Sequence, residues 1–265
     1  MAFSRSGGAR LVGTHDLALI TLDTLRYDVA AEELAAGRTP NLARLIGTWE
    51  RRHSPGTFTY AAHAAFFAGF LPTPEAPGRH PRRFALAFAG SETIGPETDV
   101  LEGATIVEGL AARGYHTLCI GGVGFFNQQN PLGRVFPSLF AEAHWSPTLG
   151  VTDPHSFEHQ LDVLESSLAN VTGRAFTFLN VSALHQPNHF YLSGGPEQDT
   201  RASHAAALRY IDAHVPRLFE ILGRRGPLFA IACSDHGTLY GEDGYVGHRV
   251  AHPIVTTVPY AEVML

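Results

Sequence analysis

The chain has 265 residues, of which 45% are hydrophobic and only 17% charged, enough for one sizeable core without a second domain. A formal net charge of −6 and a pI near 6.2 exclude a general attraction to nucleic acid or to an anionic membrane. No run has the length of a transmembrane helix or the pattern of a secretory signal, and both cysteines, Cys119 and Cys233, lie in apolar strand-like runs, so the sequence predicts a cytoplasmic protein.

The first chemically informative segment follows a short apolar run over Asp16–Leu22, which predicts a buried strand. Asp23 comes directly after it, and a carboxylate at the end of a buried strand is a natural hard ligand for a divalent cation. Arg26 and Asp28 follow closely. They either belong to the same site or form an ion pair that braces the turn from strand to helix.

The segment Thr57–Pro72 predicts a loop that enters an alanine-rich helix ending at Gly69. A threonine at such an entry lies where backbone N–H groups and the helix dipole favour negative charge. Thr57 or Thr59 is therefore either the N-cap of this helix or a nucleophile.

The remaining helices are predicted from caps and amphipathic periodicity. Thr39 and Pro40 predict the cap and first residue of one helix. Three further helices are expected over residues 102–113, 153–168 and 200–222, with Pro216 kinking or splitting the last. The proline- and glycine-rich stretch 71–96 has no clear period and predicts an irregular insertion near the site.

Two later apolar runs, Ala175–Ser182 and Pro227–Cys233, predict further buried strands. The second ends in Asp235 and His236. Because ligands of open α/β sheets collect at the carboxyl ends of strands, this pair could hold a metal ion, although an Asx turn with a surface histidine would have the same sequence. The alternation of strands and helices predicts an α/β fold with a mostly parallel central sheet sandwiched between helices.

These segments occur in a fixed order that extends over about residues 16–260: Leu22-Asp-Thr-Leu-Arg-Tyr-Asp28, Thr39-Pro-Asn-Leu42, Thr59-x-x-x-His63 through Gly69, Gly114-Tyr-His-Thr117, His185-Gln-Pro187, Ser234-Asp-His-Gly237 and Gly247-His248. Together they resemble the alkaline phosphatase superfamily, in its sulfatase-like branch. The resemblance implies an alkaline-phosphatase-like catalytic core. This core is expected to form a single minimal domain over residues 1–265, without the C-terminal subdomain of larger sulfatases.

The same resemblance implies a metal ion bound by Asp23, Asp235, His236 and the oxygen of the nucleophile. The family spacing places the nucleophile ten residues before Gly69 and a basic or histidine residue four positions after the nucleophile, which selects Thr59 and His63. A metal-bound threonine hydroxyl loses its proton more readily and is held for in-line attack on phosphorus.

The histidines in the second half of the chain leave the number of ions open. In the sulfatase-like pattern, His185 faces the substrate and either binds a transferring oxygen or assists the leaving group. Two-metal relatives carry further ligands in this region, so His185, His189 and His248 could form a second, zinc-like site. The cofactor is therefore expected to be zinc or manganese, as one or two ions.

Two departures from the sulfatase pattern argue against sulfatase activity. Thr59 cannot become the aldehyde that sulfatases form from cysteine or serine, and Gly122 stands where a substrate-contacting lysine is expected. The resemblance therefore implies metal-dependent hydrolysis of a small phosphate mono- or diester, or a phosphonate ester, through a phosphothreonine. The alternatives are a phosphotransferase acting on a soluble alcohol and an inactive metal- or ligand-binding homologue. The expected partner is a small anionic ester, with neither nucleic acid nor membrane involved, and the oligomeric state is left open.

Overall fold

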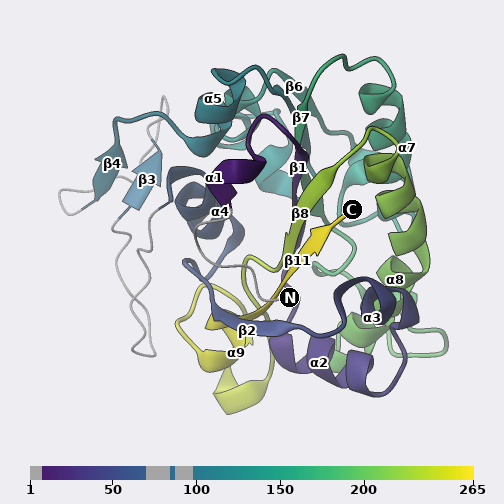
Figure 1. The fold of residues 1–265 in the computed structure, drawn as a ribbon. Helices are drawn as coiled ribbons and strands as arrows, with labels where there is room; N and C mark the ends of the chain where they lie inside the picture. Colours follow the sequence, from purple (N-terminus) through teal and green to yellow (C-terminus); the bar gives the residue numbers. More distant parts are fainter. Residues whose placement is uncertain (1–7, 70–83, 87–97) are drawn as a thin grey trace.

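The computed structural model of the protein describes residues 8–69, 84–86 and 98–265. It confirms the predicted α/β fold, with a mostly parallel sheet between layers of helices (Figure 1). The seven strands of the sheet lie in the order β2 (Glu50–His53), β11 (Thr257–Met264), β8 (Leu228–Cys233), β1 (Asp16–Leu22), β7 (Ala175–Val181), β5 (His116–Ile120) and β6 (Glu142–His144). From β8 to β6 the strands run parallel, whereas β11 is antiparallel to β8 and β2 is antiparallel to β11.

The central strands are apolar because helices cover the sheet on both sides, and all residues of β7 are buried. On one side lie α7 (Ser156–Leu168), α8 (Arg201–Gly223), α2 (Tyr27–Ala35) and α3 (Pro40–Ile46) (Figure 1). On the other side lie α4 (Thr59–Ala68) and α5 (Ile106–Ala111). Each side has its own hydrophobic cluster. Ile20 packs with the first group of helices, and Phe178 packs with the second.

The remaining α-helices and strands are short. They are α1 (Gly8–Leu11), α6 (Pro131–Arg134), α9 (Pro253–Thr256) and the paired strands β3 (Phe84–Leu86) with β4 (Asp99–Leu101) and β9 (Leu239–Tyr240) with β10 (Val246–Gly247). Most of the predicted insertion 71–96 lies outside the described residues. No helix in the described ranges is long and apolar enough to cross a membrane.

Helix α8 bears on two predictions made from single residues. Pro216 does not split it, because α8 is continuous. Pro216 has no backbone N–H to donate to the carbonyl oxygen of Asp212, and the side chain of Asn41 donates to that oxygen instead, at 3.0 Å. The carboxylate of Asp212 also accepts from the backbone N–H of Leu42 at 2.7 Å. Thr39 occupies the N-cap position of α3 and Pro40 is its first residue, as predicted. Thr39 makes no side-chain capping bond, however, and Asp212 supplies that bond instead.

Two other helices, α5 and α7, are shorter than the amphipathic pattern predicts. Helix α5 begins after a capping box between Thr105 and Glu108 and covers only the middle of the predicted range 102–113. Helix α7 ends at the predicted Leu168 but begins at Ser156. The single-domain prediction for residues 1–265 stays a prediction.

Candidate active site

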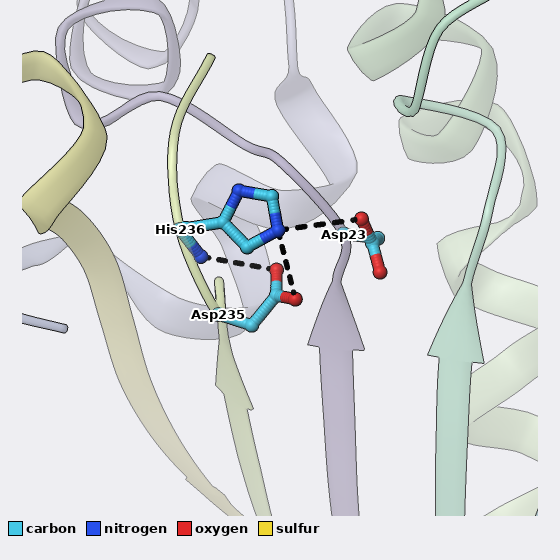
Figure 2. Close-up of side chains that lie close together, drawn as sticks. All are labelled: Asp23, Asp235 and His236. Carbon is cyan, nitrogen blue, oxygen red and sulfur yellow. Dashed lines mark hydrogen bonds and ion pairs between the residues drawn. The ribbon is translucent and has the colours of Figure 1, made fainter. Parts of the chain in front are cut away.

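The ends of two neighbouring parallel strands bring the predicted aspartates together. β1 and β8 are paired with Thr21 opposite Cys233, so Asp23 and Asp235 leave the same edge of the sheet side by side. The side chains of Asp23, Asp235 and His236 point toward one another (Figure 2). Their possible ligand atoms all lie within 4.8 Å of one another, and all three residues are buried.

The donor and acceptor pattern of this cluster fits a cation. The Nδ1 atom of His236 lies 3.0 Å from the carbonyl oxygen of Gly237, which places its proton on Nδ1 and leaves a lone pair on Nε2. That Nε2 lies 3.3 Å from Oδ2 of Asp235 and 4.0 Å from Oδ1 of Asp23. Neither of these oxygens has a hydrogen-bond partner in the described part of the chain. Three buried acceptors that face one another are unfavourable unless a cation or a proton lies between them.

The pKa values of the three residues reflect the same crowding of buried acceptors. Burial, reinforced by the charge of Asp235, raises the pKa of Asp23 to about 6. Burial raises the pKa of Asp235 to about 7, although backbone hydrogen bonds oppose the shift. Burial lowers the pKa of His236 to about 4. A divalent ion would favour both ionised carboxylates and the neutral imidazole, so the cluster suits a bound metal.

The other oxygen of each carboxylate is held by a neighbouring group. Asn180 donates from Nδ2 to Oδ2 of Asp23 at 2.9 Å, and the backbone N–H of Thr24 donates to Oδ1 of Asp235 at 3.2 Å. Each aspartate therefore turns its free oxygen toward His236. Sequence reasoning missed Asn180, although a buried amide near the end of an otherwise apolar strand was a signal of a polar contact.

The hydroxyl of Thr59 reaches this cluster. Thr59 is the first residue of α4, and its Oγ lies 3.3 Å from Nε2 of His236. The N-cap of α4 is Phe58, without a side-chain capping bond, so neither predicted threonine serves as the cap. The helix N-terminus and the acceptor cluster thus meet at one oxygen, which is the arrangement expected of a metal-assisted nucleophile.

His63 lies directly behind Thr59. Its Nδ1 donates to the carbonyl oxygen of Thr59 at 2.8 Å, and its Nε2 lies 3.3 Å from the hydroxyl of Thr21. Burial lowers the pKa of His63 to about 3, so the ring is neutral at physiological pH. Aromatic rings surround it, those of Phe66, Phe67, Phe126, Phe136 and Phe178. The position suits a residue that fixes the first turn of α4, and the predicted catalytic role stays a prediction.

Replacement of His63 by alanine is expected to lower the free energy of unfolding by on the order of 3 kcal/mol, because it leaves a cavity among the rings. It also removes the hydrogen bond to Thr59. Denaturant unfolding of the metal-loaded protein measures the loss. A variant of unchanged stability whose pH–rate profile loses an ionisation near neutrality would instead establish acid–base catalysis by His63.

Two further predicted histidines border the cluster. The ring centroid of His248 lies 4.5 Å from that of His236 and 5.6 Å from that of His185. Burial, with help from the neighbouring histidines, lowers the pKa of His248 to about 2, and its Nδ1 has no partner among the described residues. His185 donates from Nδ1 to the carbonyl oxygen of Gln186 at 2.6 Å. Both rings are half-buried, so they line the exposed side of the cluster.

The structure does not bring His189 to the other predicted ligands. Its Nδ1 lies 3.4 Å from Oδ1 of Asp199, and its ring packs against Phe190. Asp199 also accepts from the backbone N–H of His189, so this histidine is held in its own loop. Within the described ranges, the group of potential metal ligands that meets is Asp23, Asp235 and His236.

Arg26 and Asp28 form the brace that was one of the two predicted alternatives. The guanidinium of Arg26 donates to both carboxylate oxygens of Asp28, at 2.9 and 2.7 Å, and also to Glu242. Because Glu242 lies in the segment after His236, this ion-pair network ties the turn after β1 to the chain that leads to His248.

Gly122 lies in a position that no side chain can occupy. A Cβ atom there would meet the carbonyl oxygen of Asn180 at 2.4 Å and the Cβ of Ser182 at 2.7 Å. The close approach of the strand ends therefore excludes a lysine at this position. The second departure from the sulfatase pattern is thus built into the packing.

A large cavity in the described part of the chain does not contain this cluster. It measures about 470 Å³ and is lined mainly by apolar side chains of the sheet, among them Leu17, Leu19, Phe229 and Ile231. Neither Thr59 nor any predicted metal ligand lines it. The chemistry is therefore assigned to the strand ends.

No protein-family model and no curated protein matches this sequence. Solved structures do match. The soluble domain of lipooligosaccharide phosphoethanolamine transferase A from Neisseria meningitidis has a TM-score of 0.65 at 16% identity, over 95% of this chain and 77% of that chain. The zinc complex of the C-terminal periplasmic domain of EptC from Escherichia coli has a TM-score of 0.59 at 13% identity, over 95% and 74% of the two chains.

A third similar structure carries the name of the superfamily. A protein in the alkaline phosphatase superfamily from Vibrio parahaemolyticus has a TM-score of 0.57 at 16% identity, over 94% of this chain and 60% of that chain. The chain therefore has the fold of the alkaline phosphatase superfamily, and the resemblance predicted from the motifs is confirmed in the fold.

Proposed function

We propose that the protein is a metal-dependent enzyme that cleaves a small phosphate mono- or diester, or a phosphonate ester, through a phosphothreonine formed on Thr59. The observation that carries the proposal is the hydroxyl of Thr59, 3.3 Å from Nε2 of His236. That imidazole and two buried carboxylates with free oxygens form a cation site at the nucleophile. The alkaline phosphatase fold agrees with this arrangement.

The metal would be held by Asp23, Asp235 and His236, with the oxygen of Thr59 beside them. Zinc or manganese suits two carboxylates and an imidazole, and the zinc complex of a structure with the same fold supports zinc. When bound, the ion supplies Lewis-acid chemistry that lowers the pKa of the threonine hydroxyl. We propose one ion, because His189 pairs with Asp199 rather than with His185 and His248.

The reaction then has two steps, formation of the phosphothreonine and its hydrolysis. The hydroxyl of Thr59 gives up its proton to solvent, and its oxygen forms a bond to phosphorus while the bond to the leaving oxygen breaks. The N-terminus of α4 favours the negative charge. Because Nδ1 of His185 donates to the carbonyl oxygen of Gln186, Nε2 is the ring atom that can pass a proton to the leaving oxygen. Water then attacks phosphorus and gives a proton to Nε2 of His185. The bond to Thr59 breaks, and the threonine oxygen takes back a proton from solvent.

Transfer to an alcohol is the second candidate, because the similar structure from N. meningitidis is the soluble domain of a lipooligosaccharide phosphoethanolamine transferase. The chemistry of the first step is the same. Only the acceptor that releases the group from Thr59 differs, with an alcohol replacing water. The proposed acceptor is soluble, and the cytoplasmic location stays a prediction from the sequence.

Product analysis separates these functions. Zinc- or manganese-loaded protein is incubated with 4-nitrophenyl phosphate, bis(4-nitrophenyl) phosphate and, as a control, 4-nitrophenyl sulfate, each with and without glycerol or ethanolamine. Cleavage of a phosphate ester without an alcohol supports hydrolysis. Nitrophenol release that requires the alcohol and yields a phosphorylated alcohol supports transfer. Bound metal with no cleavage of any ester contradicts both and leaves a binding protein, whereas faster cleavage of the sulfate overturns the assignment of Thr59.

A further inference from the structure

Arg249 is fixed to the loop that carries the nucleophile. Its backbone N–H donates to the carbonyl oxygen of Thr57 at 2.8 Å, two residues before Thr59. Its φ is 73°, in the left-handed region that favours glycine. A long side chain at such a position costs free energy relative to glycine, and strain of this kind is concentrated at functional sites.

The side chain of Arg249 extends along the outside of the same loop. Its guanidinium carbon lies 5.4 Å from the ring centroid of Phe58, and the residue is exposed. Stacking on a ring orients the planar guanidinium while its N–H groups remain free to donate in the plane. In the described part of the chain no carboxylate pairs with Arg249, in contrast to Arg26, which Asp28 and Glu242 neutralise.

This unpaired cation lies near the reacting groups but outside them. Burial lowers the pKa of both His236 and His248, and the charge of Arg249 adds a smaller contribution to each shift. The candidate metal ligands and Thr59 are buried, whereas Arg249 is exposed. A phosphoryl group attacked by Thr59 would therefore lie inward of the guanidinium, and the remainder of the substrate would extend past it.

We infer that Arg249, oriented by Phe58, binds an anionic group on the leaving-group side of the substrate. The substrate class is then a phosphate or phosphonate ester whose other half carries a carboxylate or a second phosphate. This inference rests on the proposed function. An arginine fork recognises either oxyanion by two parallel hydrogen bonds, and a lysine at the same place would act only as a point charge.

Binding of substrate-like phosphonates tests the inference without requiring turnover. Phenylphosphonate, 4-phosphonobenzoate and 1,4-phenylenediphosphonate are titrated calorimetrically into the zinc-loaded protein. The wild-type protein is expected to bind at least one of the two probes with a second anionic group about tenfold more tightly than phenylphosphonate. Comparing these two probes distinguishes recognition of a carboxylate from recognition of a phosphate-like group. In Arg249→Gln this ratio is expected to fall close to one, with an intermediate ratio in Arg249→Lys.

Two further variants make the result decisive. Arg249→Gly relieves the left-handed strain, so it is expected to fold at least as stably as the wild type while losing the preference. Arg113→Gln removes the same charge from an exposed position at the end of α5, and it should keep the wild-type ratio. A wild-type ratio near one, or a ratio that survives in Arg249→Gln and Arg249→Gly, overturns the inference. If the protein cleaves esters but shows no such affinity ratio, the inference is overturned and the proposed function stands. If the ratio is found but no ester is cleaved, Arg249 binds the anionic group and the proposed function is contradicted.

Discussion

Replacement of Thr59 by alanine is expected to lower kcat/KM for a phosphate ester by at least about a thousandfold. The variant lacks the oxygen that lies 3.3 Å from Nε2 of His236, and water would have to attack phosphorus without a positioned nucleophile. Thr59→Ser keeps the oxygen and is expected to retain measurable turnover. Steady-state kinetics on 4-nitrophenyl phosphate after metal loading measures both effects.

The matched control is Thr57→Ala. Thr57 accepts a hydrogen bond through its backbone carbonyl, which the substitution preserves, so activity should stay within a few fold of the wild type. Mass spectrometry of acid-quenched wild-type protein is expected to find a phosphoryl group on Thr59. Equal losses in the two alanine variants, or a phosphoryl group on another residue, would contradict the assignment of the nucleophile.

Much of the fold could be predicted because its central strands are buried on both faces. Such strands are continuous apolar runs, and β1, β7 and β8 lie where these runs predict them. The antiparallel strands β2 and β11 were not predicted. The burial pattern of β2, Glu50–His53, is largely exposed, so its sequence carries no strand-like apolar run. Its place in the sheet depends on pairing with β11, which is distant in the sequence.

Some site residues could likewise be predicted from the local sequence, whereas others depend on contacts between distant segments. Asp23 and Asp235 could be predicted as neighbours because each follows a parallel strand, and such ends share one edge of the sheet. The contact of Asn180 with Asp23 depends on the register between β1 and β7, which a single sequence does not specify. Arg249 was missed because its relation to the nucleophile loop comes from one long-range backbone hydrogen bond.

The affinity of the site for zinc is expected to fall about a hundredfold between pH 7.5 and pH 5.5. Metal binding requires ionised Asp23 and Asp235, whose pKa values are raised to about 6 and about 7. As the pH falls, protons therefore compete first at Asp235 and then at Asp23, and each costs up to tenfold in affinity per pH unit below its pKa. His236, with a pKa of about 4, stays neutral in this window. Competition with a zinc-sensitive fluorescent chelator at the two pH values measures the change.

The stability of the protein should show the same linkage. Because the folded pKa values of these aspartates lie above the ordinary value of 3.8, ionising them destabilises the metal-free fold as the pH rises from about 4 toward 7. Zinc relieves that cost, so it should raise Tm more at pH 7.5 than at pH 5.5. In Asp235→Asn, which keeps the shape but removes one charge, zinc should bind far more weakly, and the metal-free protein should be at least as stable as the wild type at pH 7.5. Tight, pH-independent zinc binding by Asp235→Asn would place the ion elsewhere in the protein.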